Sequence, residues 1–147
     1  MTDSPTKIIR HKVTRLLARR EQSLHELRKK LLESVDDKAL IEEVLAQFRA
    51  KDIQSDLRYA EAVVRGAYRK GKGPSFVERC LAEHDIEYSL VATLIASDDF
   101  DWFELARAVR VKKYGEEAPE DWQAKQKQMR FLQYRGFYQE QINYAFE

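Results

Sequence analysis

The chain has 147 residues, of which 44% are hydrophobic and 35% are charged, and its formal net charge is +1. This length suits one domain or a short array of smaller units, and the aromatic content of 11% argues against a disordered chain. The single cysteine, Cys80, excludes an intramolecular disulfide and a thiolate metal cluster, so we expect a reducing, cytoplasmic location.

Residues 1–8 are expected to form an N-terminal tail. Polar side chains occupy the positions at which a signal peptide needs an apolar core. No uninterrupted apolar run in the chain approaches the roughly 20 residues that cross a bilayer. We therefore expect a soluble protein without a membrane partner.

Helical periodicity runs through almost the whole sequence, and strand alternation is nowhere sustained, so the predicted fold class is all-α. Ser23 and Glu26 have the spacing of a capping box, and Pro74 after Gly73 suits the first turn of a helix. Four further N-caps are expected at Asp36, Ser55, Asp85 and Asp98. These signals predict helices over 9–20, 23–34, 36–50, 55–70, 74–84, 86–97, 99–114, 119–135 and 138–147.

Apolar residues recur along these helices at intervals of 50 or 51 residues. The three matching sets are Leu31, Val35 and Val44; Leu81, Ile86 and Ile95; and Leu132, Phe137 and Phe146. Chance similarity among helices of equal length is the alternative explanation. A true repeat predicts three tandem three-helix units, covering 9–51, 52–97 and 98–147, in an elongated, curved array that offers a long surface to partners.

Charge alternates along the chain in blocks that the near-neutral total conceals. Residues 1–30 carry a net charge of +6 and residues 81–108 a net charge of −6. If the units stack in register, the basic blocks form a stripe suited to a phosphate backbone or an acidic protein groove. The members of this basic stripe are Arg15, Arg19, Arg20, Arg28, Lys29, Lys30, Arg65, Arg69, Lys70, Lys72, Arg110, Lys112 and Lys113. The alternative is a set of solvated helix faces with local ion pairs, and the acidic blocks would suit a protein partner better than nucleic acid.

The stretch "RKGKGPSFVERCL" (69–81) raises the question of a phosphate-binding loop. A Walker loop follows a strand and ends in Gly-Lys-Ser/Thr, so that backbone amides and a lysine hold the phosphates. Here a helix precedes the loop, and Pro74 lacks an amide hydrogen. We interpret residues 71–74 as a hinge between two helices.

No catalytic or metal-binding constellation is evident, and neither a cofactor nor a metal is expected. His11, His25 and His84 belong to different predicted helices, and no two of them have the spacing of metal ligands on one helix face. Cys80 falls on a face expected to be buried, so a packed thiol is favoured over a nucleophile. We therefore predict that the protein is not an enzyme.

The doublet Asp-Trp occurs twice near expected helix starts, at Trp102 and Trp122. Packing within or between units is the favoured role for these tryptophans. An exposed tryptophan would instead be able to stack on a base.

Four stretches of the sequence resemble the RecX family, bacterial proteins that regulate the RecA recombinase. They are "LLARREQSLHELRKKL" (16–31), "RYAEAVVRGAYRKGKGPSFVERCL" (58–81), "DWFELARAVRVKKYGE" (101–116) and "RFLQYRGFYQEQI" (130–142). Together they extend over nearly the whole chain. The most specific pieces are the pattern around Arg19, Ser23 and Glu26, the Gly73-Pro74 turn, and "QYRGF" (133–137).

One departure from the family pattern falls at the opening of the second unit. Relatives usually have Gly-Tyr-Leu-Asp-Asp or a close variant there, whereas this chain has "KDIQSD" (51–56). Aspartate at the glycine position is tolerable because it adopts the left-handed conformation more readily than most residues do.

The resemblance implies a non-enzymatic modulator that lies in the helical groove of the RecA filament on single-stranded DNA. By bridging successive protomers, such a protein would hinder filament extension, ATP turnover and strand exchange, and so damp homologous recombination, DNA repair and the SOS response. The implied partners are the RecA filament and DNA, single-stranded and also double-stranded, and a monomer is the plainer expectation. Two alternatives stay open: a stand-alone helical nucleic-acid-binding protein, and an enzyme using Cys80 or a histidine.

Overall fold

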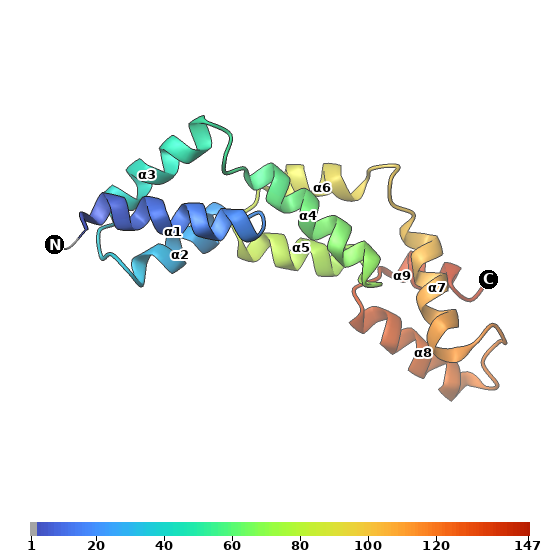
Figure 1. Cartoon of the computed structure of the whole chain (residues 1–147). Helices are drawn as coiled ribbons and strands as arrows, with labels where there is room; N and C mark the ends of the chain where they lie inside the picture. The colour runs from blue at the N-terminus through green and yellow to red at the C-terminus, as the bar shows by residue number, and fades with distance from the viewer. Residues whose placement is uncertain (1–2) are drawn as a thin grey trace. The chain divides into compact units, whose positions relative to one another are not determined.

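The computed structural model of the chain describes residues 3–147, and over that range the regular secondary structure is entirely helical (Figure 1). The described helices are α1 (Pro5–Arg19), α2 (Leu24–Leu32), α3 (Lys38–Ala50), α4 (Asp56–Arg69), α5 (Pro74–Glu83), α6 (Tyr88–Ile95), α7 (Trp102–Tyr114), α8 (Trp122–Tyr134) and α9 (Gln139–Tyr144). The all-α prediction is confirmed. None of these helices is long and apolar enough to span a lipid bilayer.

Two of the predicted helix starts are confirmed in detail. Ser23 accepts a hydrogen bond from the backbone N–H of Glu26, whose carboxylate accepts one from the backbone N–H of Ser23, which completes the capping box. Ser55 accepts a hydrogen bond from the backbone N–H of Arg58 at 3.2 Å, as a cap of α4 does.

The other three N-cap predictions are wrong. Helix α3 is capped by Asp37 rather than Asp36, and α7 by Asp101 rather than Asp98. Asp85 caps no helix and has a φ of 56°, whereas Glu87 precedes α6. Each of these segments contains several carboxylates, so composition alone did not identify the one that reaches the free amides.

The first helix begins earlier than predicted. Pro5 occupies the first turn of α1, and the Ser4 side chain accepts a hydrogen bond from the backbone N–H of Lys7. Residues 5–8 of the expected tail are therefore helical, and residues 1–2 lie outside the described part of the chain.

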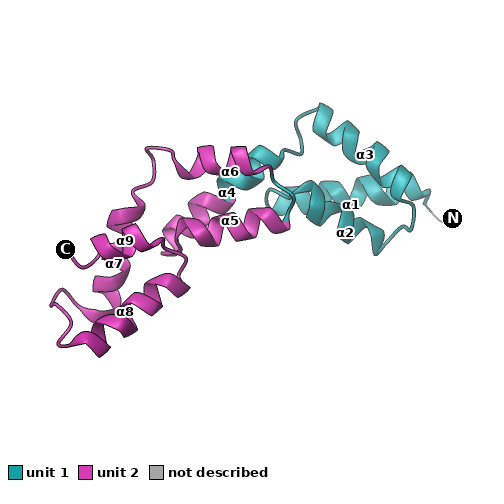
Figure 2. Ribbon diagram, turned by 180° about the vertical axis from the view of Figure 1, so that it is seen from behind, with its two compact units in different colours: residues 1–62, 84–86 teal, residues 63–83, 87–147 magenta. Residues whose placement is uncertain are grey.

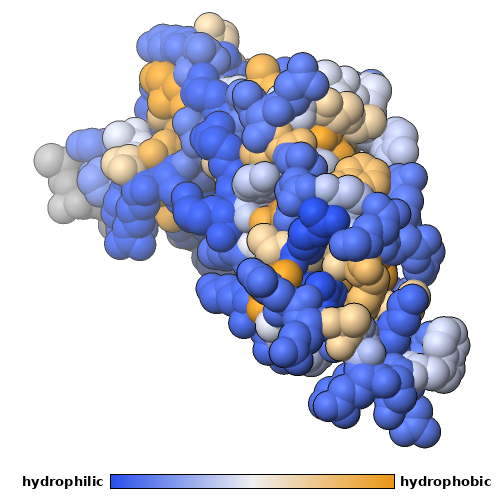
Figure 3. Space-filling view, turned by 90° about the vertical axis from the view of Figure 1, so that its right-hand side faces the viewer, coloured by the Kyte–Doolittle hydropathy of each residue, from blue (hydrophilic) through white to orange (hydrophobic). Residues whose placement is uncertain are grey.

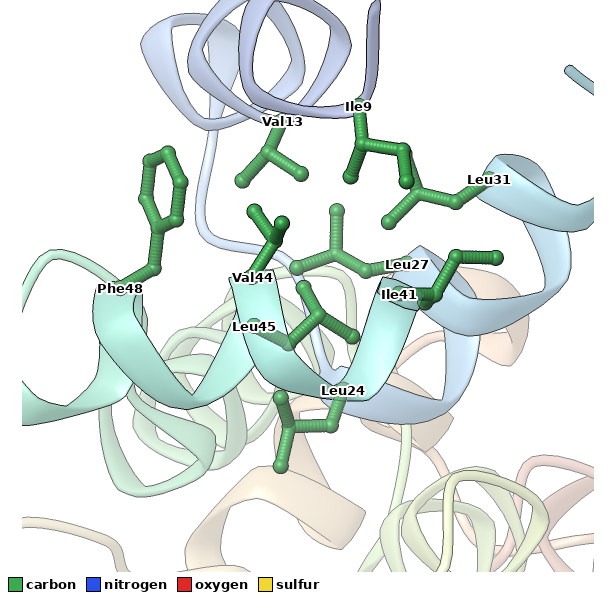
Figure 4. Close-up of a cluster of buried hydrophobic side chains, with 9 residues drawn as sticks. All are labelled: Ile9, Val13, Leu24, Leu27, Leu31, Ile41, Val44, Leu45 and Phe48. Atoms are coloured by element: carbon green, nitrogen blue, oxygen red, sulfur yellow. The ribbon is translucent and has the colours of Figure 1, made fainter. Parts of the chain in front are cut away.

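The helices gather into two compact units: residues 1–62 with 84–86, and residues 63–83 with 87–147 (Figure 2). In unit 1 the side chains of α1, α2 and α3 point toward one another and form a closed apolar core (Figure 4). Leu27, Leu31 and Val13 are fully inaccessible to solvent there. Because this core orients the three helices, it also determines which of their faces, with their charged side chains, are exposed to solvent.

In unit 2 a second core joins α7, α8 and α9 around Ala106, Leu132 and Ile142. Leu31, Leu81 and Leu132, the first anchors of the three matching sets, are all completely buried at the ends of α2, α5 and α8. The equivalence of these positions supports a repeating helical arrangement. The division at 51/52 and 97/98 into three units stays a prediction.

Asp52 adopts the left-handed conformation with a φ of 58°, which aspartate tolerates better than most residues do. It closes the end of α3, where the backbone N–H of Ile53 donates to the carbonyl of Phe48 at 2.9 Å. Aspartate at this position thus adopts the conformation that closes the helix end.

Candidate partner-binding surface

The strongest candidate site is a groove within unit 2, lined by the end of α4 and by α7 and α8, with a volume of about 420 Å³. Five cations and no carboxylate line it. The lining residues are Arg69, Lys70, Gly71, Leu105, Ala108, Val109, Lys112, Lys113, Phe131 and Arg135. We call it the basic groove. Its positive charge would attract an anionic group, and apolar side chains such as Leu105 and Val109 line it as well.

Helix periodicity explains how α7 contributes both apolar and basic side chains to the groove. Ala108 and Lys112 lie four residues apart on one face, as do Val109 and Lys113. All four residues line the groove, and each lysine follows its apolar neighbour by one helical turn. The last turn of a helix also favours cations because of the helix dipole.

Arg135 ties the two sides of the basic groove together. Its guanidinium donates a hydrogen bond to the carbonyl of Lys70 at 3.3 Å and lies 5.2 Å from the ring centre of Phe131. The ammonium of Lys113 lies over the same ring at 4.4 Å. Phe131 is thus already covered by cations and serves to position them.

A close backbone contact holds this side of unit 2 in place. The N–H of Gly73 donates to the carbonyl of Arg135 at 2.8 Å, and the N–H of Ser75 donates to the carbonyl of Gly136 at 2.9 Å. A Cβ atom on Gly73 would lie 2.4 Å from the Gly136 oxygen. The turn interpreted as a hinge is therefore docked onto the "QYRGF" segment, a contact that sequence reasoning missed.

In unit 1, three predicted members of the basic stripe are engaged within the chain. Arg20 forms a two-pronged ion pair with Glu26, with N···O distances of 2.9 and 3.0 Å. Arg28 pairs with Glu42, and Lys30 donates to Gln22. Among the described residues, Arg15, Arg19 and Lys29 are exposed and make no ion pair, so they are the members of the predicted basic stripe in unit 1 that a partner can reach.

We expect the Arg20–Glu26 pair to stabilise unit 1 in a pH-dependent way. Burial alone would raise the pKa of Glu26, but hydrogen bonds from Arg20 and from the Ser23 backbone lower it below its ordinary value. The contribution is therefore complete above about pH 4.3 and is lost as pH falls through the lowered folded-state pKa. Glu26→Gln should reduce the free energy of unfolding at pH 7 by about 0.5–1 kcal/mol and by less near pH 3.

Urea unfolding followed by circular dichroism at both pH values measures this difference. Glu43→Gln is the matched control, because Glu43 is exposed on α3 and has no ion-pair partner in the described chain. A constant deficit of Glu26→Gln from pH 7 to pH 3 would show that the ion pair is not its cause.

The prediction that Arg110 belongs to an exposed basic stripe is wrong. It is only 6% exposed, its Nε donates to the carbonyl of Ala145 at 2.7 Å, and its guanidinium lies over the ring of Phe146. Arg110 joins α7 to the end of α9 inside unit 2, and a partner cannot reach it. Arg65 is exposed on α4, and Lys72 follows the end of that helix.

His25 and His84 belong to different predicted helices, but their side chains lie together in unit 1, with ring centres 5.5 Å apart. Ser23 Oγ lies 2.7 Å from His84 Nδ1, and His25 Nδ1 lies 3.2 Å from a carboxylate oxygen of Asp85. Ser23 is completely buried and already accepts the N–H of Glu26, so a substrate cannot approach it. The cluster is a structural cap; among the described residues no group of His, Cys, Asp and Glu suits a metal ion.

The two tryptophans differ in their environment. Trp102 is 6% exposed and donates from its indole nitrogen to the carbonyl of Ile95, which confirms the packing prediction. Trp122 is 69% exposed, so the same prediction is wrong for it. Cys80 is also more accessible than expected, although burial and the nearby Glu83 raise the pKa of its thiol, which disfavours a nucleophilic thiolate.

Comparison with known proteins gives consistent matches. The family model for the third three-helix domain of RecX matches residues 99–146. Regulatory protein RecX of Acinetobacter baylyi is 41% identical over 123 residues, which are 83% of this chain and 76% of that protein. Regulatory protein RecX of Vibrio parahaemolyticus is 34% identical over 142 residues, 97% of this chain and 92% of that protein.

The fold is also that of solved RecX structures. A crystal structure of regulatory protein RecX superposes with a TM-score of 0.80 at 20% identity, covering 95% of this chain and 71% of that one. The crystal structure of RecX from Lactobacillus salivarius gives a TM-score of 0.79 at 18% identity, over 96% and 94% of the two chains. With the sequence identity to the Acinetobacter and Vibrio proteins over most of both chains, these matches show that the chain belongs to the RecX family of regulatory proteins.

Proposed function

We propose that this chain binds the RecA nucleoprotein filament and inhibits its extension, ATP hydrolysis and strand exchange. It would thereby modulate homologous recombination, DNA repair and the SOS response in the cytoplasm, acting as a monomer and without chemistry of its own. Membership of a family of regulatory proteins supports this role. We also propose that the chain consists of three tandem helical units, at 9–51, 52–97 and 98–147.

The single observation that carries the proposal is the basic groove of unit 2. Five cations and several apolar side chains line it without one carboxylate, an arrangement suited to the phosphates or acidic surfaces of a nucleoprotein. The proposed partner surface comprises Arg15, Arg19, Lys29, Arg65, Arg69, Lys70, Lys72, Lys112, Lys113 and Arg135. Arg20, Arg28 and Lys30 would contribute less to the binding energy. Each would have to break a contact with a side chain of this chain before it could contact a partner.

The test is the hydrolysis of ATP by RecA on single-stranded DNA. The chain is added to filaments already assembled from the RecA of the same genome, so that competition for bare DNA does not enter. We expect the hydrolysis rate to fall as the chain is added. An unchanged rate at saturating protein would refute the proposal.

A stand-alone nucleic-acid-binding protein is the second candidate, favoured by the same cluster of cations. The two functions differ in what they require. A plain nucleic-acid binder loses affinity steeply with salt and needs no recombinase. A filament regulator acts on RecA-coated DNA at protein concentrations at which bare DNA is hardly bound.

A further inference from the structure

A second hollow of about 380 Å³ lies in unit 2 and has no role in the groove described above. It is lined by α5, by the residue before the Gly73-Pro74 turn and by the end of α8. The lining residues are Lys72, Phe76, Arg79, Cys80, Glu83, Gln133 and Tyr134. Tyr134 is 83% exposed, more than the other large hydrophobic side chains of the described chain.

The hollow and the basic groove adjoin each other along two short segments. Lys70 and Gly71 line the groove and Lys72 lines the hollow; Arg135 lines the groove and Tyr134 the hollow. Consecutive Cα atoms are only about 3.8 Å apart, so the linings of the two depressions share two short stretches of backbone. The hydrogen bond from the Gly73 N–H to the Arg135 carbonyl joins these two backbone segments.

The side of unit 2 seen in Figure 3 is mostly hydrophilic, with apolar side chains in separate patches between the polar ones. Tyr88 and Trp122 are also largely exposed, but neither of them lines this hollow or the basic groove. Tyr134 makes no ring contact with another aromatic residue of the described chain, and Lys72 and Arg79 line the same hollow.

We propose that the hollow and the basic groove form one binding path for single-stranded nucleic acid, in which a base stacks on Tyr134 and the adjoining backbone phosphate lies among Lys70, Lys112 and Arg135. The proposal rests on the proposed function and names the nucleic-acid contact within it. Stacking platforms beside a cationic track are how proteins hold single strands without reading their sequence.

The observations favour a single strand over two other occupants. The faces of bases in a duplex are covered by their neighbours, so Tyr134 can stack only on an unpaired base. An acidic peptide would use the cations but leave the exposed ring without a function. Phe131 cannot serve as the platform instead, because Lys113 and Arg135 already lie over its ring.

Binding of a fluorescein-labelled oligothymidylate to the full chain, followed by anisotropy, tests the proposal. Tyr134→Ala should weaken binding about 5- to 150-fold, the range for loss of one stacked base. Tyr134→Phe should retain most of the affinity and Tyr134→Leu should not, because a planar ring is what stacks. Tyr88→Ala is the matched control, since Tyr88 is 74% exposed on α6 of the same unit but lines neither depression.

Cys80 allows the contact to be located, because it is the only cysteine in the chain and lines the hollow. A saturating oligothymidylate should slow the reaction of a maleimide with Cys80 in the wild type. The protection should be weaker in Tyr134→Ala when the oligonucleotide concentration is chosen to be just enough to saturate the wild type. An alkylation rate that the oligonucleotide does not change would overturn the proposed path.

Two outcomes separate this proposal from the proposed function. If Tyr134→Ala binds the oligothymidylate as the wild type does, the stacking site is refuted, whether or not RecA is inhibited. If the wild type fails to slow ATP hydrolysis by RecA while the Tyr134 dependence holds, the filament role fails and the nucleic-acid site stands. A duplex of equal length that shows the same dependence on Tyr134 would also contradict stacking.

Discussion

Gly136→Ala should be the most destabilising single-methyl substitution in unit 2, lowering the free energy of unfolding by about 2–4 kcal/mol. Two causes act together. The backbone φ of Gly136 is 98°, in a region that L side chains rarely adopt. A Cβ atom there would also lie 2.8 Å from the backbone nitrogen and the Cβ atom of Phe76. Neither neighbour is the end of a flexible side chain, so the backbones must separate.

Three other glycines separate the two causes. Gly115, with a φ of 88° and nothing within 4 Å of an added Cβ, tests backbone strain alone. Gly73 tests the collision alone, because its Cβ would lie 2.4 Å from the Gly136 oxygen. Gly66 lies within α4 with open space around it, so Gly66→Ala should stabilise the helix by about 0.5–1 kcal/mol.

Urea unfolding followed by tryptophan fluorescence measures this series, because both tryptophans, Trp102 and Trp122, lie in unit 2. Gly115→Ala and Gly73→Ala should each cost about 1–3 kcal/mol, and Gly136→Ala should cost more than either. If Gly73→Ala is as stable as the wild type, the docking of the turn onto the "QYRGF" segment is not what holds this side of the unit.

The helices were predictable because local signals decide them. Apolar periodicity predicted each of the described helices. Both hydrogen bonds of the predicted capping box between Ser23 and Glu26 are present. The predicted N-cap was wrong where two carboxylates are adjacent, as at Asp36 and Asp37. There the N-cap is the residue whose side chain reaches the free backbone amides of the first turn, and the sequence does not show which one that is.

The candidate site was predictable in part. Arg69, Lys70, Lys112 and Lys113 were singled out by charge, and the structure brings them to one groove. Arg110 was misassigned, although a signal existed. It lies four residues after Ala106 and eight after Trp102, both buried, so helix periodicity places it on the inner face of α7.

Arg135 and Tyr134 could not be assigned from the sequence. Their roles depend on the contact between the Gly73 turn and the end of α8, two segments some 60 residues apart in the chain. No local pattern encodes that contact. The only sequence signal was a glycine in each segment, and glycine has too many uses to identify a partner.

The last prediction concerns the charge of the basic groove. Lys112→Glu combined with Lys113→Glu should weaken binding to RecA filaments about 10- to 100-fold, because two attractive charges are lost and two anions repel the same surface. Both lysines are exposed and make no ion pair within the described chain, and the contact of Lys113 with the Phe131 ring contributes only about 0.5–1 kcal/mol, so the fold should be retained. Circular dichroism confirms this before binding is measured.

Lys38→Glu with Lys125→Glu is the matched control, since it changes the net charge equally at exposed positions that do not line the groove. A general charge effect would weaken both pairs alike; a site effect weakens only the first. Arg69→Glu with Lys70→Glu borders the same groove as Lys112 and Lys113, so joining the two pairs should add less than the sum of their effects.

Arg15→Glu with Arg19→Glu alters a different unit. If that surface engages the same filament, its combination with the Lys112 and Lys113 pair should cost more than ten times the affinity lost by either pair alone, because each contact raises the effective concentration of the other. A silent Arg15 and Arg19 pair in both backgrounds would confine the partner contact to unit 2.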